Sequence, residues 1–192
     1  MTSDGLRERS KARRREAILR AAYELFADRG FEATTIADIA TAAEVSPRTV
    51  TLYFPSKLEL ALSEFDSFAD RLRGAVRSRE AGLTTLDALE RWLREEMAHR
   101  SDLDDLADRA LDLNPPLRAA AGARLAEVIQ DGAEILAEEQ GSAPDDFGPR
   151  MAAAAAAAVI GEVCRRAQEA DIDTAIAFLR AGLATLPSRP AS

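Results

Sequence analysis

The sequence predicts an all-α protein, and three observations support that prediction. Apolar residues recur at spacings of three and four residues almost throughout the chain, which is the period of an amphipathic helix. Strand signals are scarce, because aromatic residues make up only 5% of the chain and β-branched residues rarely alternate with polar ones. Residues 152–158 are consecutive alanines, and alanine has the highest helix propensity.

The first helix is predicted over about residues 11–29, with one apolar face turned to a core. Gly30 follows it and can adopt the left-handed conformation that often ends a helix. A short second helix is predicted over residues 35–43, because Thr35 and Asp38 have the spacing of a capping box.

The third helix should begin after Ser46 as N-cap, with Pro47 at the first helical position, where its missing N–H is not needed. Val50 and Phe54 lie one turn apart and point inward, and Pro55 ends the helix. Two short helices joined by such a turn form a helix-turn-helix. The alternative is an ordinary helical hairpin whose second helix has a Ser-Pro cap.

A fourth helix is predicted from Ser56 to the late seventies, before Gly82. About five more helical stretches follow, because turn-forming residues divide the remaining chain. These dividing segments are Gly82, residues 114–116, residues 141–144 and residues 171–173.

Net charge differs sharply between the two parts of the chain. Residues 1–57 carry ten Lys and Arg against eight Asp and Glu, a charge of +2, and residues 58–192 carry fifteen against twenty-five, a charge of −10. We therefore predict two domains, residues 1–57 and residues 58–192. A local positive patch is expected from the crowded cations Arg7, Arg9, Lys11, Arg13, Arg14 and Arg15, although a solvated helix end would explain them as well.

In a helix-turn-helix the second helix enters the major groove of DNA with its first turn toward the base edges. Arg48 and Thr49 supply hydrogen-bond donors in that turn. Thr51 and Tyr53 also point outward, and Lys57 follows at the start of the next helix, where an ammonium group and a helix N-terminus both favour a phosphate. The motif therefore predicts a double-stranded DNA operator as partner.

Residues 18–62, ILRAAYELFADRGFEATTIADIATAAEVSPRTVTLYFPSKLELAL, resemble the tetracycline-repressor (TetR) family of bacterial transcriptional regulators. The resemblance implies an N-terminal three-helix DNA-binding domain followed by a helical ligand-binding and dimerisation domain. It also implies repression that a small molecule relieves, with activation as the alternative. The resemblance and the motif together predict the DNA-binding residues Arg13, Arg14, Thr35, Ser46, Pro47, Arg48, Thr49, Thr51, Tyr53 and Lys57.

Two residues depart from the pattern of that family. Glu44 stands in the turn where the family usually has Gly, so either a left-handed conformation costs roughly 1 kcal/mol there or the turn is built differently. Thr51 stands where the family favours Tyr, so one phosphate contact is expected to be shorter or mediated by water.

An enzyme is not predicted, because the sequence contains no glycine-rich phosphate loop, nucleophile elbow or CxxC motif. His99 is the single histidine and lies near Glu95, Glu96 and Asp102, so it is either a metal ligand or a helix C-terminal residue that contacts backbone carbonyls. We predict no cofactor and no metal. A regulator-like interaction module without DNA binding remains the second hypothesis.

The protein is expected in the cytoplasm. The longest apolar run, residues 151–161, is too short to cross a bilayer, and the N-terminus lacks the apolar stretch of a secretory signal. The single Cys164 cannot form an internal disulfide.

A homodimer that reads a palindromic operator is expected, because one helix-turn-helix reads few bases. The last two helices, near residues 150–170 and 172–186, are the predicted dimer surface. The alanine run allows close approach, and an apolar stripe follows at Ile176, Leu179, Leu183 and Leu186, although the same stripe could be internal core.

A small-molecule effector site is predicted between the fourth helix and the stretches near residues 86–100 and 103–113. Large apolar side chains with a few polar anchors are typical of such pockets, although they are also typical of plain core. The predicted ligand-binding residues are Phe65, Phe68, Leu89, Trp92, Met97, His99, Leu106 and Arg109.

Overall fold

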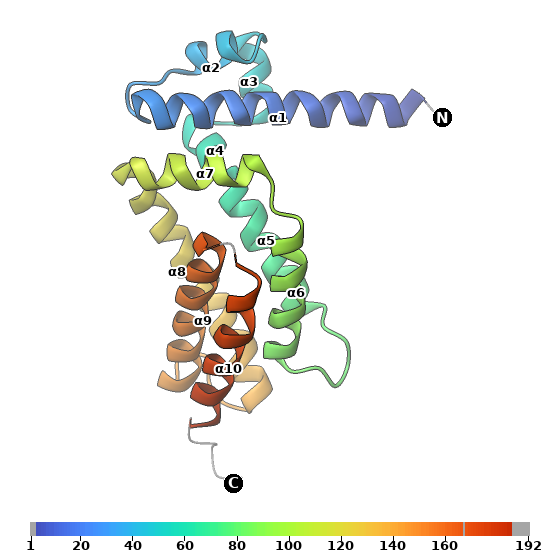
Figure 1. The fold of residues 1–192 in the computed structure, drawn as a ribbon, viewed down its shortest axis with the longest axis vertical. Helices are drawn as coiled ribbons and strands as arrows, with labels where there is room; N and C mark the ends of the chain where they lie inside the picture. Colours follow the sequence, from blue (N-terminus) through green and yellow to red (C-terminus); the bar gives the residue numbers. More distant parts are fainter. Residues whose placement is uncertain (1–2, 167, 186–192) are drawn as a thin grey trace. The chain divides into compact units, whose positions relative to one another are not determined.

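The structure is a computed structural model that describes residues 3–166 and 168–185. Every regular element in those two ranges is helical, which confirms the predicted all-α class (Figure 1). The helices are α1 (Ser3–Arg29), α2 (Ile36–Ala42), α3 (Pro47–Tyr53), α4 (Lys57–Ala61), α5 (Ser63–Arg77), α6 (Thr85–Ala98), α7 (Asp102–Leu113), α8 (Pro115–Gln140), α9 (Phe147–Arg166) and α10 (Ala170–Ala184).

The chain folds into two compact units. Unit one contains residues 1–66 together with residues 101–121, and unit two contains residues 67–100 and 122–192. These units differ from the division at residue 57 that the charge pattern predicts. Unit one takes α7 from the acidic part of the chain, because α7 packs along α1 and contributes the buried Ala110 to its core.

The core of unit one is built on α1. Ile18, Leu19, Tyr23 and Phe26 are completely buried on one face of this helix, at the spacing that places them on adjacent turns. α2, α4 and α7 pack around that face. Burial raises the pKa of the Tyr23 phenol to about 12, since the charged phenolate would lose its hydration.

α1 begins at Ser3, eight residues before the predicted start near residue 11. The apolar pattern does not reach this first part, and residues 6–14 are exposed. Lys, Arg and Glu are nevertheless good helix formers, so a solvated helix can extend beyond the apolar face that nucleates it. Arg9 adds one hydrogen bond, from its Nε to the carbonyl of Gly5 at 3.0 Å.

The predicted helix ends in the helix-turn-helix are confirmed. Thr35 and Asp38 form a reciprocal capping box at the start of α2, and Ser46 caps α3. Gly30 has a φ of 89° after α1, as expected for a residue that ends a helix. Glu44 has a φ of 53°, so the first of the two alternatives for this turn holds: a non-glycine residue occupies the left-handed region.

The single helix predicted from Ser56 onward is wrong, because the chain forms two helices there. α4 ends at Ala61, and α5 starts at Ser63 after the break at Leu62, whose φ and ψ are −100° and 3°. Leu60, Ala61 and Leu62 are consecutive and all buried. Successive residues of a straight helix point about 100° apart, so the break helps three neighbours in sequence reach the core.

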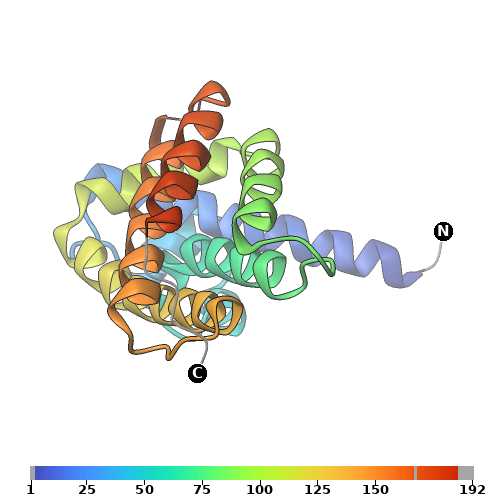
Figure 2. The same ribbon diagram turned by 90° about the horizontal axis from the view of Figure 1, so that it is seen from below.

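Unit two is a bundle in which α6, α9 and α10 share one core. Trp92, Leu93, Ile160 and Ile172 are buried there, and α10 packs against both α6 and α9 (Figures 1 and 2). By length and composition α9 also meets the requirements for a membrane-crossing helix. Core helices of soluble proteins can meet the same requirements of length and composition.

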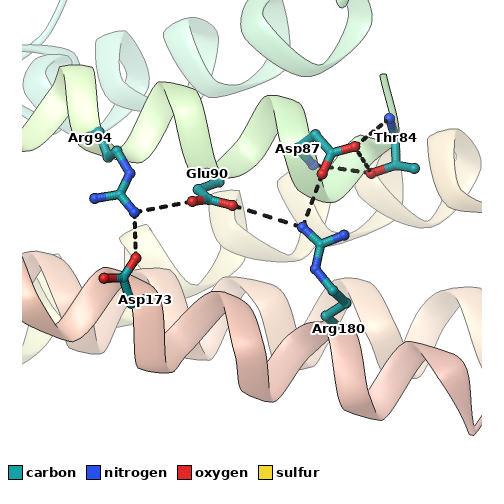
Figure 3. Close-up of polar contacts among 6 residues, drawn as sticks. All are labelled: Thr84, Asp87, Glu90, Arg94, Asp173 and Arg180. Atoms are coloured by element: carbon teal, nitrogen blue, oxygen red, sulfur yellow. Dashed lines mark hydrogen bonds and ion pairs between the residues drawn. The ribbon is translucent and has the colours of Figure 1, made fainter. Parts of the chain in front are cut away.

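A row of ion pairs fixes the rotation of α10 on α6 (Figure 3). Arg180 binds Asp87 at 3.0 Å, Arg94 binds Glu90 at 3.1 Å, and Arg94 also contacts Asp173. Hydrogen bonds donated by Thr84, and to a smaller extent by Arg180, lower the pKa of Asp87 to about 2. This face of α10 is therefore held against α6, and the face that carries Phe178, which is 64% exposed, remains outside.

Glu44→Gly should stabilise the protein, because glycine adopts the left-handed conformation without the steric penalty of a Cβ atom. The expected gain in the free energy of unfolding is up to about 1 kcal/mol, reduced by the greater chain entropy of unfolded glycine. Urea denaturation measures it, and Glu44→Ala, which keeps the strained Cβ, is the matched control. Equal stability of the two variants would contradict the strain at this turn.

Candidate nucleic-acid interface

The recognition-helix candidate, α3, is held at its start by local hydrogen bonds. The Ser46 hydroxyl accepts a hydrogen bond from the Thr49 amide at 3.0 Å and lies 2.8 Å from the Thr49 hydroxyl. Val50 is completely buried and Phe54 is 4% exposed, so the inner face of α3 is fixed by the core of unit one. The outer face is therefore presented in a defined orientation.

The outer face of α3 carries one cationic side chain, several hydroxyl groups and one large apolar side chain. Pro47, Arg48 and Thr51 are exposed, while Thr49 and Tyr53 are half-buried. Within the described residues, no hydrogen-bond or ionic partner holds the Arg48 guanidinium. Its charge and donor groups are therefore available for a base edge or a phosphate.

Leu52 belongs to this face but is missing from the predicted DNA-binding set. It is 82% exposed, the highest exposure among the large apolar side chains of the described chain. An apolar side chain in the major groove can contact the methyl group of thymine. Its position three residues after Thr49 places it on the outward side of α3, and this spacing was the available sequence signal.

The predicted DNA-binding residues of α1 and of the start of α2 differ in exposure and in their partners. Arg13 and Arg14 are exposed, whereas Arg15 pairs with Glu64 at 3.3 Å and stacks over the Phe54 ring. The Thr35 hydroxyl donates a hydrogen bond to Asp38 at 2.6 Å while it caps α2. These hydrogen bonds lower the pKa of Asp38.

Lys57 is half-buried, and its ammonium group serves the protein itself. Nζ donates hydrogen bonds to the carbonyls of Phe31, at 2.8 Å, and Thr34, at 2.9 Å, and it lies 4.2 Å from the centre of the Phe31 ring. An ammonium group has three donors, so one N–H remains. Lys57 is the first residue of α4, as the sequence predicts, and this helix is short because it ends at Ala61.

Asn114, at the junction of α7 and α8, also holds the connection between α1 and α2. The Phe31 amide donates to Asn114 Oδ1 at 2.6 Å, and Asn114 Nδ2 donates to the carbonyls of Phe26 and Ala110 at 2.9 and 2.7 Å. Asn114 is only 4% exposed. Nothing in the helix-turn-helix sequence signals this residue, which lies 83 positions beyond Phe31.

The eight predicted ligand-binding residues are not brought together within one unit. Trp92 packs edge-on against Phe68 with ring centres 5.0 Å apart, and its Nε1 has no hydrogen-bond partner among the described residues. His99 Nδ1 donates to the Glu95 carbonyl at 2.6 Å, as expected for a helix C-terminal residue. Unit one holds Phe65, Leu106 and Arg109, and unit two holds Phe68, Leu89, Trp92, Met97 and His99.

Comparison with known proteins connects this geometry to a function. The sequence profile of the bacterial regulatory proteins of the tetR family matches residues 18–63, which covers α2, α3 and α4. The transcriptional regulator TcmR of Streptomyces glaucescens is 34% identical over an alignment of 172 residues that covers 84% of this chain and 76% of TcmR. The chain belongs to the tetR family. It is therefore a DNA-binding transcriptional regulator and not an enzyme.

Other tetR-family relatives agree in sequence or fold. The transcriptional activator FasR of Mycolicibacterium smegmatis is 41% identical over 78 residues, which are 41% of this chain and 35% of FasR. The fold also matches NalD, the secondary repressor of the MexAB-OprM multidrug efflux pump of Pseudomonas aeruginosa, with a TM-score of 0.62. That match covers 91% of this chain and 97% of NalD at 22% identity.

Asn114→Leu should destabilise the protein, because the partly buried Phe31 amide loses its acceptor and the buried Phe26 and Ala110 carbonyls lose a donor, while the side-chain volume is nearly kept. We expect a loss of about 1–3 kcal/mol in the free energy of unfolding, measured by urea denaturation. The control is Thr41→Val, which removes an exposed hydrogen bond to the Ala37 carbonyl and should change stability by less than about 0.5 kcal/mol. An unchanged midpoint for Asn114→Leu would show that this bridge does not hold unit one.

Proposed function

We propose that this tetR-family regulator is a cytoplasmic repressor that binds a palindromic operator as a homodimer and is released by a small molecule. The observation that carries the proposal is the outer face of α3, which is fixed by the buried side of the helix. On this face Leu52 is exposed, and Arg48 has no side-chain partner among the described residues. Such a helix fits the major groove of DNA with its first turn toward the bases.

The proposed DNA contacts divide into base reading and backbone binding. Pro47, Arg48 and Thr49 belong to the first turn of α3 and would meet base edges or phosphates, and we now add Leu52 as a candidate for a thymine methyl group. The remaining residues of this side of unit one would meet the phosphate backbone: Arg13, Arg14, Thr35, Ser46, Thr51, Tyr53 and Lys57. Lys57 would use the N–H that is left after its two bonds to carbonyls.

Arg48→Ala should weaken operator binding by roughly 1–3 kcal/mol and relax base preference at one position of each half-site, because Arg48 supplies the charged donors of α3. Fluorescence anisotropy with the operator and with single-base variants measures both effects. Lys57→Ala should weaken all sequences alike. Arg109→Ala removes an exposed arginine of the same unit and should leave base preference intact. If Arg48→Ala retains the full preference, α3 is not the reading helix.

A dimer surface on α9 and α10 is supported by the side chains that these helices leave outside. Phe147, Met151 and Phe178 are 78%, 41% and 64% exposed, and Ala154 and Ala158 are exposed after Met151 along α9. Small residues allow two helices to approach closely, and large exposed apolar groups are typical of interaction surfaces. Of the predicted stripe, Ile176 and Leu179 are instead buried in the core, Leu183 is partly buried against it, and Leu186 lies outside the described residues.

The substitutions that probe the dimer must therefore change the exposed alanines. Ala155 and Ala156 are half-buried and pack against the core of unit two. Ala154→Arg should instead convert the dimer to monomers and abolish operator binding, because a charge would be buried at the contact. Analytical ultracentrifugation measures the mass. Ala126→Arg, at an exposed position of α8, is the control. A wild-type protein that is monomeric at micromolar concentration contradicts the proposal.

Release by a small molecule is supported by unit two, which contains a cavity of about 80 Å³ between α5, α6, α8 and α9. Of the predicted ligand residues, Leu89 lines it. A ligand can release DNA only if it favours a conformation in which the two recognition helices no longer match the half-sites. Repression is the direction favoured here, and the activator FasR makes activation the outcome to test in a transcription assay.

A further inference from the structure

The cavity of unit two has a wall of aliphatic side chains. Leu72 and Val76 come from α5, Leu89 from α6, Ile135 from α8 and Ile160 from α9. No aromatic ring lines the cavity in the described part of the chain. An apolar wall of this kind offers few hydrogen bonds, and a buried water needs about two to four polar partners, so water fills the space poorly.

The charged groups at the wall are already paired with each other. Arg73 Nε donates to Asp131 at 2.6 Å, and Arg77 lies 3.7 Å from the other carboxylate oxygen. Arg73 also binds Asp70 at 2.5 Å. A charged ligand would compete with these pairs and would lose its own hydration next to the aliphatic wall, which is unfavourable.

Thr85 is the residue of the wall that carries a hydroxyl group. The Thr85 hydroxyl donates to Glu139, and the Thr85 amide donates to the same carboxylate oxygen at 3.0 Å. A hydroxyl oxygen that donates its hydrogen can still accept a hydrogen bond. The cavity can therefore recognise one neutral donor, such as an alcohol, at the end where Thr85 lies.

The space results from residues with little or no side chain. Gly132, Ala153, Ala156 and Ala157 line the cavity between its larger aliphatic residues. A Cβ atom on Gly132 would lie 3.4 Å from the Ala153 Cβ, so the two helices are already close there. The volume of about 80 Å³ exceeds the roughly 10–15 Å³ needed for one water, and it is about half that of an engineered cavity that binds benzene.

From this wall we infer the chemical class of the effector: a compact, uncharged, aliphatic molecule of at most about one ring, which must widen the empty space to fit, with at most one hydroxyl group placed toward Thr85. The inference rests on the proposed function, because it names the ligand of the proposed release site. Charged molecules and extended aromatic systems are excluded from the class by the paired charges and the small volume.

Because α9 lines the cavity, a bound ligand can affect the proposed dimer surface on the same helix. Ala156 and Ala157 line the cavity, while Ala154 and Ala158 are exposed on another side of the same helix. A ligand larger than the empty space must displace part of its wall, since protein interiors are close-packed. Displacement of α9 would change the surface on which the second subunit rests.

Cyclohexanol is the probe, with cyclohexanecarboxylate and cyclohexylammonium as charged controls of similar shape. At about five times its dissociation constant, cyclohexanol should raise the unfolding midpoint by about 2–4 °C, and the charged analogues should raise it by less than a quarter of that. In protein with labelled alanine methyl groups, nuclear Overhauser contacts should join the probe to Ala153, Ala156 and Ala157. Absence of these contacts, or equal shifts with a charged analogue, overturns the inference.

A cavity-filling variant provides the second arm. Ala157→Leu should abolish the cyclohexanol shift, and Ala126→Leu, at an exposed position outside the cavity, should retain it. If Ala157→Leu does not fold, the methyl contacts in the unaltered protein decide. Operator titration with and without cyclohexanol is measured separately: binding without release contradicts the proposed release mechanism but leaves the ligand class standing, whereas failure to bind contradicts the ligand class alone.

Discussion

The side-chain amide of Asn114 is the contact on which the DNA-reading part of the protein depends. It joins the end of α1, through the Phe26 carbonyl, to the end of α7, through the Ala110 carbonyl, and it accepts the amide of Phe31. All three backbone groups come from elements that pack against the core of unit one. An apolar residue at this place would leave buried polar groups unpaired, so the amide fixes where α1 stops and where the chain turns toward α2.

Lys57 also holds the connection between α1 and α2, through hydrogen bonds to backbone carbonyls. Its bonds to the Phe31 and Thr34 carbonyls place a cation next to the segment that leads into the capping box of α2. The helix-turn-helix is thus held by one neutral and one charged side chain, each outside α2 and α3. The exposed face of α3 is therefore not needed to hold the fold, since α3 itself contributes only Val50 to the fully buried core.

Local sequence signals predicted the helix-turn-helix closely, because they act within a few residues. The cap at Thr35, the Ser-Pro start of α3 and the left-handed Gly30 all depend on neighbours in the chain. The break at Leu62 and the bridge at Asn114 depend on contacts between distant segments, which periodicity does not contain. The ligand-binding residues were predicted from composition, as large apolar side chains. The cavity instead lies where the small residues Gly132 and Ala157 leave space between helices, and this depends on contacts between distant segments.

The alanine run of α9 shows how one stretch of identical residues acquires different environments. The helical turn places Ala152 and Ala153 in the core, Ala156 and Ala157 at the cavity and Ala154 outside. Sequence alone could not assign these positions, since each carries the same methyl group. The rotation of the helix is set by its larger residues, Ile160 and Val163, which are buried next to α6 and α10 residues.

Unit one is discontinuous in the chain, and this has a practical consequence for protein engineering. A DNA-binding segment that is exchanged between regulators at residue 57 or 66 would lose α7. It would also lose the Asn114 side-chain amide, which holds the connection between α1 and α2. The recipient's own helix would have to supply an equivalent side chain at the corresponding register. A transferred DNA-binding segment should therefore include residues 101–121 as a second graft. The helix-turn-helix would then keep the residues that support it in its own protein.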